Sequence, residues 1–457
     1  MQAEKLPVLN DDAKSGSRLT FSGEGIALTL AAGLLGLTLE VTSGFYSPVG
    51  ITLLGLSFVA CAVAVLWRPS WKIQESHARI LLASIACAQL IVLLCRQPRK
   101  DLFDIANIAI AVAGLILITF DGRRASIAGF LMLLAAFAGL GIHRLRNVPR
   151  PNIDVFMFHV DSAEALHHGE NPYAITFPDF YGPSGDWVYG PGIVRNGRLQ
   201  FGYPYPPLTL LLASAGYLLL GDPRYAMLLA MMVAAIFIAL MRRDRIGMLA
   251  GAILLFTPRC LLILEMAWTE PLSVVLLAMT ILSIYRQSRW TPFWFGLLIA
   301  SKQYLVAAIV LILLVPRRES RRAQWSDLQF LVIGCAVALA VTLPIAAWNW
   351  DAFMYSVVKL QFHQPYRHDA LSFLARWGSN KPDWQGPFWL AFATLAIAVA
   401  GCIWRLPRSA QNFVAAFALC FFAFFAFNKQ AFANYYYLVL GAICCAIGSA
   451  SSSADEI

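Results

Sequence analysis

The sequence predicts an all-α, polytopic membrane protein, a transmembrane bundle of about 11–14 apolar segments with a long outer loop that bears interfacial helices. Of its 457 residues, 59% are hydrophobic and 13% are charged, and the mean hydropathy is +0.64. Soluble domains carry roughly 25% charged residues. Apolar runs of about 18 residues recur along the chain, and they lack the alternation of membrane β-strands.

The first part of the chain is predicted to be a supporting block. A polar tail covers residues 1–24, and the first apolar run is expected to serve as its own signal. Five apolar segments follow, near 25–43, 48–67, 78–95, 103–120 and 125–143. Ionisable residues in these segments lie only near the ends, as at Glu40 and Asp104. We therefore expect an accessory transmembrane block at 25–143 that contains no site.

The outer loop, residues 144–203, is the longest polar interruption of the chain. Six of the 26 acidic residues and three of the seven histidines lie between 150 and 207. A connection between membrane helices could be short, so a long one rich in aromatic residues and carboxylates indicates a functional segment. We expect it to carry the chemistry.

The remaining apolar segments complete a catalytic membrane domain at 144–450, before a polar tail at 451–457. Two further polar patches, 349–384 and 427–437, are expected to meet the outer loop on one membrane face. The segments lie near 205–220, 223–241, 246–264, 268–285, 291–315, 327–348, 386–405, 411–427 and 434–450.

Charge distribution predicts the topology. The net charge of +9 is gathered in short clusters between apolar runs, which indicates the positive-inside bias and no nucleic-acid partner. The clusters at 242–245, 285–289 and 316–322 should all be cytoplasmic. It follows that 246–285 turns on the outer side near Glu265–Glu270, and that 291–315 is a tight hairpin turning at 301–303. The alternative is that 291–315 is one span, which would place Lys302 near the bilayer centre at a cost of roughly 2.5–3.5 kcal/mol. An outward loop at 144–203 also requires that 205–220 does not cross completely.

The nine cysteines lie in or beside apolar segments and form no CxxC pair, so neither a zinc site nor a disulfide framework is indicated.

Residues 152–168 are predicted to form an interfacial helix, with Asn152 as its N-cap. Asp154, Asp161 and His168 are spaced i, i+7, i+14 and share one face. A carboxylate at the interface can act as a general base toward a hydroxyl. One alternative is that these residues form a solvated polar face. Another is a metal site made of His159, Asp161, Glu164 and His168, although their spacing matches no recognised ligand pattern.

Lys302 is the one charged residue in the apolar run 291–315. A lysine held inside a membrane indicates a functional site, here for a lipid phosphate. In the structural alternative it snorkels or pairs with a carboxylate such as Glu265 or Glu270. Glu270, beside Pro271, is a second candidate.

Weaker candidates for binding the same anion lie in the second and third polar patches. Aromatic residues at helix ends are more often membrane-belt anchors, which is the alternative for the tyrosine run at 435–437. The candidates are Arg367, His368, His363, Tyr366, Lys429, Gln430, Asn434 and Tyr435.

Several short motifs together resemble the GT-C-fold integral membrane glycosyltransferases, and most of all their bacterial family 87 branch. They are Asp154 with AEAL (163–166), GENPY (169–173) and YPYPPL (203–208), then WTEPL (268–272), GLLIASKQY (296–304) and NKQAFANYYY (428–437). The resemblance covers roughly 140–440. In that family the acidic loop follows the first span, so the resemblance makes residues 1–124 an addition.

The resemblance implies transfer of a sugar from a polyprenyl-phosphate donor to an acceptor hydroxyl, at the outer face of a bacterial inner membrane. Asp154 matches the catalytic acid/base position, with Glu270 as a second acid, and Lys302 matches the lysine that faces the donor phosphate. Asp161, on the same helix face as Asp154, is a further catalytic candidate. The acceptor would be a lipid or a glycan. The substrate-binding candidates are His168, Tyr173, Tyr205, Gln303 and Tyr435.

No cofactor is predicted, and a divalent cation stays open. No P-loop or Rossmann glycine motif supports a nucleotide-sugar donor. The rival class is a transporter or lipid-carrier flippase with Lys302 and Glu270 in the translocation path, although we see no internal repeat of the kind that transporters carry. An oligosaccharide polymerase or ligase would share the lipid-phosphate requirement.

Overall fold

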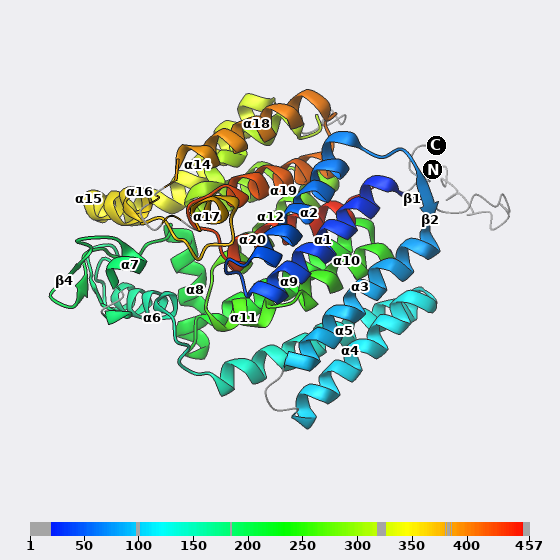
Figure 1. Cartoon of the computed structure of the whole chain (residues 1–457), viewed down its shortest axis with the longest axis horizontal. Coiled ribbons are helices and arrows are strands. Elements are labelled where there is room, and N and C mark those ends of the chain that lie inside the picture. The colour runs from blue at the N-terminus through cyan, green and yellow to red at the C-terminus, as the bar shows by residue number, and fades with distance from the viewer. Residues whose placement is uncertain are drawn as a thin grey trace, which may run out of the picture.

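The computed structural model describes residues 20–96, 101–182, 185–317, 326–379, 381, 384 and 386–450. Within these residues the protein is an all-α bundle, as predicted (Figure 1). The C-terminal tail and residues 1–19 of the N-terminal tail lie outside the described residues. The division of the chain that assigns residues 1–24 to a polar tail stays a prediction. Strand β1 (Thr20–Ser22) pairs with β2 (Lys72–Gln74), and the first helix begins at Gly23.

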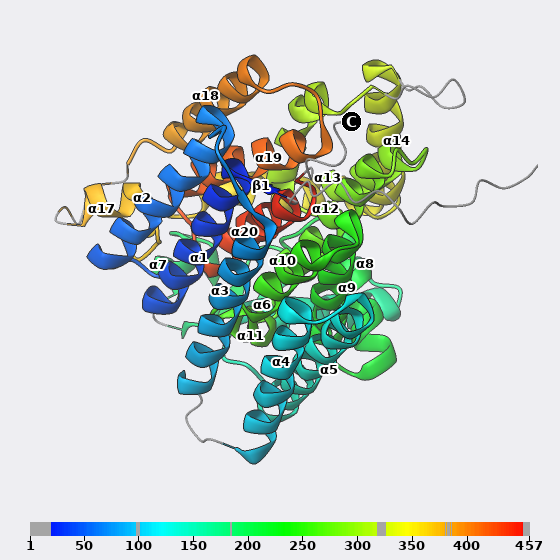
Figure 2. The same ribbon diagram turned by 90° about the vertical axis from the view of Figure 1, so that its right-hand side faces the viewer.

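The predicted apolar segments of the accessory block all form helices, and two of these helices are capped by a serine at the N-terminus. Ser22 accepts a hydrogen bond from the backbone N–H of Gly25, and Ser47 accepts one from Gly50. Figure 2 shows α4 and α5 side by side at the edge of the bundle. The helices are α1 (Gly23–Thr42), α2 (Pro48–Ala62) with a π-helical continuation (Val63–Trp67), α3 (Glu75–Arg96), α4 (Leu102–Phe120) and α5 (Arg123–Asn147).

The outer loop folds as a small unit of short helices and strands at one end of the bundle (Figure 1). Its rings form a separate core that includes Phe158, Phe177, Phe201 and Tyr203. Its elements are α6 (Asp154–His167), β3 (Phe177–Pro178), α7 (Gly185–Tyr189), β4 (Val194–Arg195) and β5 (Arg198–Leu199), with the strand order β3-β5-β4.

The rest of the chain forms the main bundle. Pro258, which has no backbone N–H, and Arg259, at φ 70°, separate α10 from α11. The elements are α8 (Pro207–Leu220), α9 (Arg224–Arg242), α10 (Arg245–Phe256), α11 (Cys260–Glu265), α12 (Glu270–Tyr285), α13 (Thr291–Ala300), the 3₁₀ helix η3 (Gln303–Leu314), α14 (Asp327–Ala346), η4 (Ala347–Asn349), α15 (Trp350–Phe353), the π-helical η5 (Met354–Lys359), α16 (Leu360–His363), α17 (Phe373–Gly378), α18 (Trp389–Arg405), α19 (Ala410–Ala426) and α20 (Ala433–Gly448).

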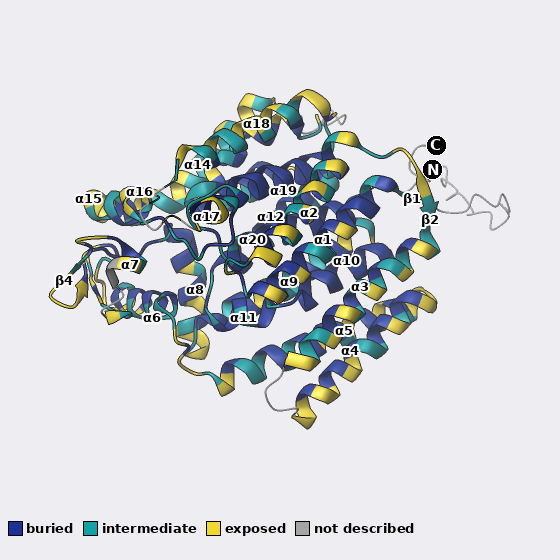
Figure 3. Ribbon diagram, in the orientation of Figure 1, coloured by how far each residue is buried: buried dark blue, intermediate teal, exposed yellow. Residues whose placement is uncertain are grey.

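Burial separates central helices from lipid-facing ones. Figure 3 shows α10, α19 and α20 almost wholly buried, whereas α14 and α18 carry exposed apolar side chains such as Leu328 and Ile397. Apolar surface of this extent fits lipid as the surrounding solvent. Among the described residues, seven helical runs are long and apolar enough to cross a membrane, namely α1, α2 with its continuation, α3, α4, α5, α9 and the run Asp327–His363. Eight further apolar helices are shorter.

The accessory block packs directly on the main bundle. Its helix α1 lies against α20, and its helix α3 lies against α10. The predicted division into two blocks stays a prediction.

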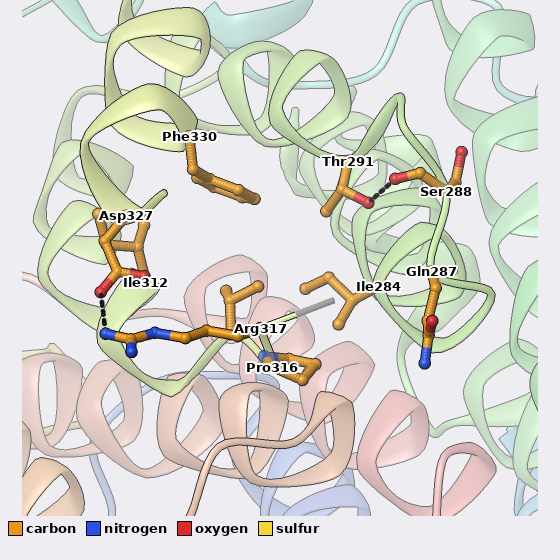
Figure 4. Close-up of a pocket in the computed structure, with 10 residues that line it drawn as sticks. Ile284, Gln287, Ser288, Thr291, Ile312, Pro316, Arg317, Asp327 and Phe330 are labelled. Carbon is orange, nitrogen blue, oxygen red and sulfur yellow. Dashed lines mark hydrogen bonds and ion pairs between the residues drawn. The ribbon is translucent and has the colours of Figure 1, made fainter. Parts of the chain in front are cut away.

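The described parts of the three basic clusters meet at one end of the bundle, as the topology prediction requires. The Arg286 guanidinium donates to the carbonyl oxygen of Leu240 at 2.6 Å. Thr291 and Arg317 line one small cavity of about 50 Å³ (Figure 4). Since these two residues flank the segment 291–315, its two ends lie together. The segment therefore folds as a hairpin whose turn is Ser301-Lys302. That this hairpin is re-entrant in the membrane stays a prediction.

Two further topology predictions concern the segments on either side of the hairpin. Glu265 ends α11 and Glu270 begins α12, so a turn lies between them, as predicted. That this turn faces the outer side stays a prediction. Helix α8 has 14 residues, and its first turn reaches the hairpin, where the Thr209 hydroxyl donates to the carbonyl oxygen of Ser301 at 2.5 Å. At its other end Tyr217 donates to Glu164 of α6. Helix α8 therefore lies between the hairpin turn and α6. That it does not cross the membrane completely stays a prediction.

Candidate functional site

The turn of the hairpin holds Lys302 inside the bundle. Lys302 has an extended backbone (φ −150°, ψ 145°) between α13 and η3, and the Ser301 hydroxyl lies 2.9 Å from that of Ser273. The Lys302 ammonium lies 3.0 Å from Oε1 of Glu270, at side-chain exposures of 5% and 0%. Tyr304 donates a hydrogen bond to the same oxygen at 3.3 Å. Lys302 therefore has the ion-pair partner that its structural alternative required.

Glu265, the other carboxylate considered as a partner of Lys302, forms an ion pair with Arg144. Its Oε2 atom lies 2.5 Å from Nε of Arg144. Glu270 is thus the carboxylate that neutralises Lys302.

The ring of Tyr205 connects the hairpin turn to α6. The Lys302 ammonium lies 4.3 Å from its centroid, within range of a cation–π interaction. The His159 ring of α6 stacks on Tyr205 at a centroid distance of 6.0 Å and an interplanar angle of 22°, and its Nδ1 lies 3.1 Å from the Tyr203 hydroxyl. Burial lowers the pKa of His159 to about 3, so the imidazole is neutral at physiological pH.

Asp154 is the first residue of α6 and faces two tyrosines of the outer loop. The Tyr189 hydroxyl donates to Oδ2 at 2.9 Å, and the Tyr181 hydroxyl donates to Oδ1 at 3.3 Å. Desolvation raises the pKa of Asp154 above its usual value, while both hydrogen bonds act in the opposite direction. A carboxylate with a raised pKa is a stronger base once it is ionised. Its charge also acts on the Tyr205 hydroxyl, as does that of Glu270.

Helix α6 begins at Asp154, whereas a cap at Asn152 would start it at residue 153. The prediction that Asn152 caps this helix is wrong. Ile153 occupies the N-cap position, no side chain caps the helix, and Asn152 is exposed.

The predicted face of Asp154, Asp161 and His168 does not form one site. Fourteen residues of helix extend about 20 Å, and His168 is exposed at the far end. Asp161 is half-exposed, and its pKa is raised by partial burial and by the charge of Glu164. The metal alternative is not formed either, because His159 is buried against tyrosines whereas Glu164 is exposed. Among the described residues, no group of three or more His, Cys, Asp or Glu side chains could hold a metal ion.

A cavity of about 1450 Å³ opens beside Lys302 and has two chemically different parts. One part is polar and lies among the connecting segments of the outer end. The other is apolar and runs between η3, α14 and α18, where Val306, Leu339 and Phe392 are each about half exposed. Polar lining comes from Lys302, Gln303, His363, His368, Asn428 and Lys429.

The three polar patches meet around this cavity, as predicted. Lys429 donates to the carbonyl oxygen of Gln364 at 2.6 Å, and Gln430 donates to that of Pro365 at 3.0 Å. Gln303 donates to the carbonyl oxygen of Pro204 at 2.7 Å. Burial lowers the pKa of Lys429.

The other candidates take different places. Arg367 makes a bidentate ion pair with Asp369 at 2.8 Å and lies between the rings of Trp187 and Phe432. Tyr173 is buried and donates to the carbonyl oxygen of Tyr205 at 2.8 Å.

The described lining of the cavity includes Tyr205, Lys302, Gln303, His368, Lys429 and Tyr435, and does not include Asp154, Asp161, His168, Tyr173, Glu270 or Arg367.

Sequence reasoning missed the residues that hold the two charged groups in place. Tyr181 and Tyr189 bind Asp154, and Tyr304 binds Glu270. The signal available for Tyr304 was its place two residues after Lys302. The tyrosine-rich composition of the outer loop pointed to no particular ring.

Comparison of the chain with protein-family models, with curated proteins and with solved structures finds no match. The likeness to GT-C glycosyltransferases rests on the sequence motifs alone.

Proposed function

We propose that this protein is an integral membrane glycosyltransferase of GT-C type, which transfers a sugar from a polyprenyl-phosphate donor to an acceptor hydroxyl. The observation that carries the proposal is the two-part cavity with Lys302 at its polar side. A polyprenyl-phosphate sugar is itself divided in this way, into a long apolar chain, an anionic phosphate and a polar sugar.

Lys302 is the proposed contact of the donor phosphate. In a site that excludes water, a fixed cation stabilises the negative charge that develops on the leaving phosphate. The groove between η3, α14 and α18 would take the isoprenoid chain, because its wall is apolar and carries the half-exposed side chains of Val306 and Phe392. Gln303, His368, Lys429 and Tyr435 remain candidates for the phosphate and sugar, since they line the same cavity.

Asp154 is the proposed general base for the acceptor hydroxyl. It is half-buried next to Tyr205, a ring that lines the cavity, and desolvation raises its pKa. For the base to reach the acceptor, its hydrogen bonds with Tyr181 and Tyr189 must open or be shared. The transfer would invert the sugar, with Asp154 taking the hydroxyl proton as the phosphate leaves.

The acceptor is proposed to be a lipid or glycan at the outer face of a bacterial inner membrane. The cavity's polar lining lies at the end of the bundle that carries the outer loop, opposite the basic clusters (Figure 1). The positive-inside bias assigns the basic end to the cytoplasm.

Incubation of the purified protein with labelled polyprenyl-phosphate sugars and a panel of membrane acceptors tests the proposal. Asp154→Asn should lower transfer by about 10²–10⁴-fold without loss of donor binding, whereas Asp161→Asn, on the same helix, should change transfer little. Transfer that survives Asp154→Asn would remove the proposed base. Movement of the lipid across vesicles without any transfer would favour the flippase instead.

The phosphate contact needs a paired variant, because removing Lys302 alone leaves Glu270 as an uncompensated buried charge. We expect the double variant Lys302→Gln/Glu270→Gln to fold and to lose donor binding. Donor binding as tight as that of the wild type would contradict the role of Lys302.

A further inference from the structure

Trp187 of α7 lines the cavity with an indole that has no role in the proposed chemistry. It is 50% exposed, and it belongs to the polar part of the cavity because α7 is an element of the outer loop. An exposed tryptophan at a membrane surface is often an interfacial anchor. The contacts of Trp187 point to a different use.

A stacked guanidinium holds the indole in place. The Arg367 guanidinium carbon lies 4.4 Å from the ring centroid of Trp187 and 5.0 Å from that of Phe432. Asp369 accepts two hydrogen bonds from this guanidinium at 2.8 Å, and the backbone N–H of Arg367 donates to the carbonyl oxygen of Lys429 at 3.1 Å. The support of the indole is therefore built by the second and third polar patches together.

A glycine three residues later lets the loop of Trp187 approach the second polar patch closely. Gly190 has φ 107°, in the left-handed region that favours glycine. A Cβ atom at this position would lie 3.0 Å from the carbonyl oxygen of His363. This close approach keeps the loop of Trp187 against the segment 361–366, which lines the same cavity.

Amide side chains line the cavity together with Trp187. An amide is neutral, and it both donates and accepts hydrogen bonds. It therefore matches a hydroxyl group, which also does both. These amides belong to Gln303, Gln361, Gln364, Asn428 and Gln430.

An aromatic face beside neutral hydrogen-bonding groups is the recognition chemistry of a sugar ring. The C–H groups on the face of a sugar pack on the negative face of an aromatic ring, while its hydroxyls need donors and acceptors. A tryptophan offers this contact at a low cost in conformational entropy, and the stack with Arg367 lowers that cost further. A phosphate gains nothing from the indole face, and an alkyl chain gains nothing from the amides.

We propose that Trp187, supported by Arg367, is a stacking platform for a sugar ring in the polar part of the cavity. The inference rests on the proposed function, which supplies two sources of such a ring, namely the sugar of the donor and a sugar of a glycan acceptor. It assigns Arg367 to the positioning of Trp187, although the sequence made Arg367 a candidate for the donor phosphate.

The first arm of the test measures donor binding to the full-length protein in detergent micelles. The probes are polyprenyl phosphates that carry mannose, glucose or arabinose, and polyprenyl phosphate without a sugar. If the platform holds the donor sugar, Trp187→Ala should weaken binding of the sugar-bearing lipid by about tenfold. Binding of polyprenyl phosphate should not change, which also shows that the variant folds. Trp187→Tyr keeps an aromatic face and should retain most of the affinity.

The second arm measures KM for a glycan acceptor in the transfer assay. If the platform holds the acceptor sugar, Trp187→Ala should raise this KM by about tenfold and leave kcat and donor binding unchanged. An unchanged donor affinity together with an unchanged acceptor KM overturns the inference.

The matched control is Trp377→Ala. Trp377 is 54% exposed and packs on Phe427 at a centroid distance of 6.1 Å, but it is not part of the described lining of the cavity. This variant should leave donor binding and acceptor KM at their wild-type values. Equal losses in the two alanine variants would make Trp187 an interfacial anchor and overturn the inference too.

The two proposals fail differently. Transfer that does not depend on Trp187 removes the platform and leaves the glycosyltransferase proposal intact. Sugar-dependent binding through Trp187 without any transfer keeps the platform and favours the flippase. If the wild-type protein shows neither sugar-dependent binding nor transfer, both proposals are removed.

Discussion

At the scale of single residues, the two tyrosines around Asp154 control when this carboxylate is ionised. The Tyr189 hydroxyl donates to it at 2.9 Å and stabilises its charged form. Removing this hydroxyl should therefore raise the pKa of Asp154 further, because the hydrogen bond opposes the effect of desolvation.

Tyr189→Phe should accordingly shift the acid limb of the pH–rate profile to higher pH. Asp154 acts as a base only when it is ionised, so a higher pKa moves the loss of activity upward in pH. The measurement is kcat/KM against pH for sugar transfer. Tyr217→Phe, which removes a hydroxyl bonded to Glu164 on the same helix, should leave the profile in place. An unchanged acid limb in Tyr189→Phe would show that Asp154 is not the group that titrates.

At the scale of elements, the hairpin of α13 and η3 brings a lysine into the bundle without carrying a charge across the membrane. Helix α13 extends about 15 Å at 1.5 Å per residue, half the thickness of a hydrocarbon core of roughly 30 Å. The turn at Ser301 is held by Thr209 and Ser273. Thr209 thus provides a hydrogen-bond donor for the backbone carbonyl of Ser301, and Ser273 provides a partner for its hydroxyl.

The hairpin makes a topology prediction that a single span would not. Cysteines placed at Arg289 and Arg317, which are both exposed, should be labelled by an impermeant maleimide from the same side of the membrane. A cysteine at exposed Arg195 of the outer loop should be labelled from the other side. Each of these variants also carries Cys95→Ser, because the native Cys95 is exposed and would itself be labelled. Labelling of Arg289→Cys and Arg317→Cys from opposite sides would make 291–315 a complete span.

At the scale of the whole molecule, the parts that could be predicted are those encoded by composition over long runs. The lengths of the apolar runs predicted the positions of the helices. Lys302 was recognised as a candidate because charged residues are rare inside lipid-facing segments. Contacts made by short polar loops could not be predicted in this way. Arg367 was a candidate for the anion because it lies in a polar patch, yet Asp369, only two residues later, pairs with its guanidinium. Nothing in a loop without periodicity says which rings reach Asp154.

The outer end of the molecule depends on one fully buried arginine that joins four segments. The Arg224 guanidinium pairs with Asp222 at 2.6 Å and donates to the carbonyl oxygens of Val148 and Glu265 at 2.8 and 3.3 Å. It also lies 4.8 Å from the ring centroid of Phe156 on α6. Arg224 therefore ties the end of the accessory block to α9, to α11 and to the helix that carries Asp154.

Arg224→Met should destabilise the protein by about 3–5 kcal/mol, because it removes the cation that pairs with the Asp222 carboxylate and the donor to the carbonyl oxygens of Val148 and Glu265. Denaturant unfolding in mixed micelles measures the change. Asp222→Asn/Arg224→Met should recover part of the loss, since residues of one network do not contribute additively. Arg195→Met, on the exposed loop, should stay within about 0.5 kcal/mol of the wild type. A stable Arg224→Met variant with normal transfer would mean that packing between the apolar helices is enough to position α6.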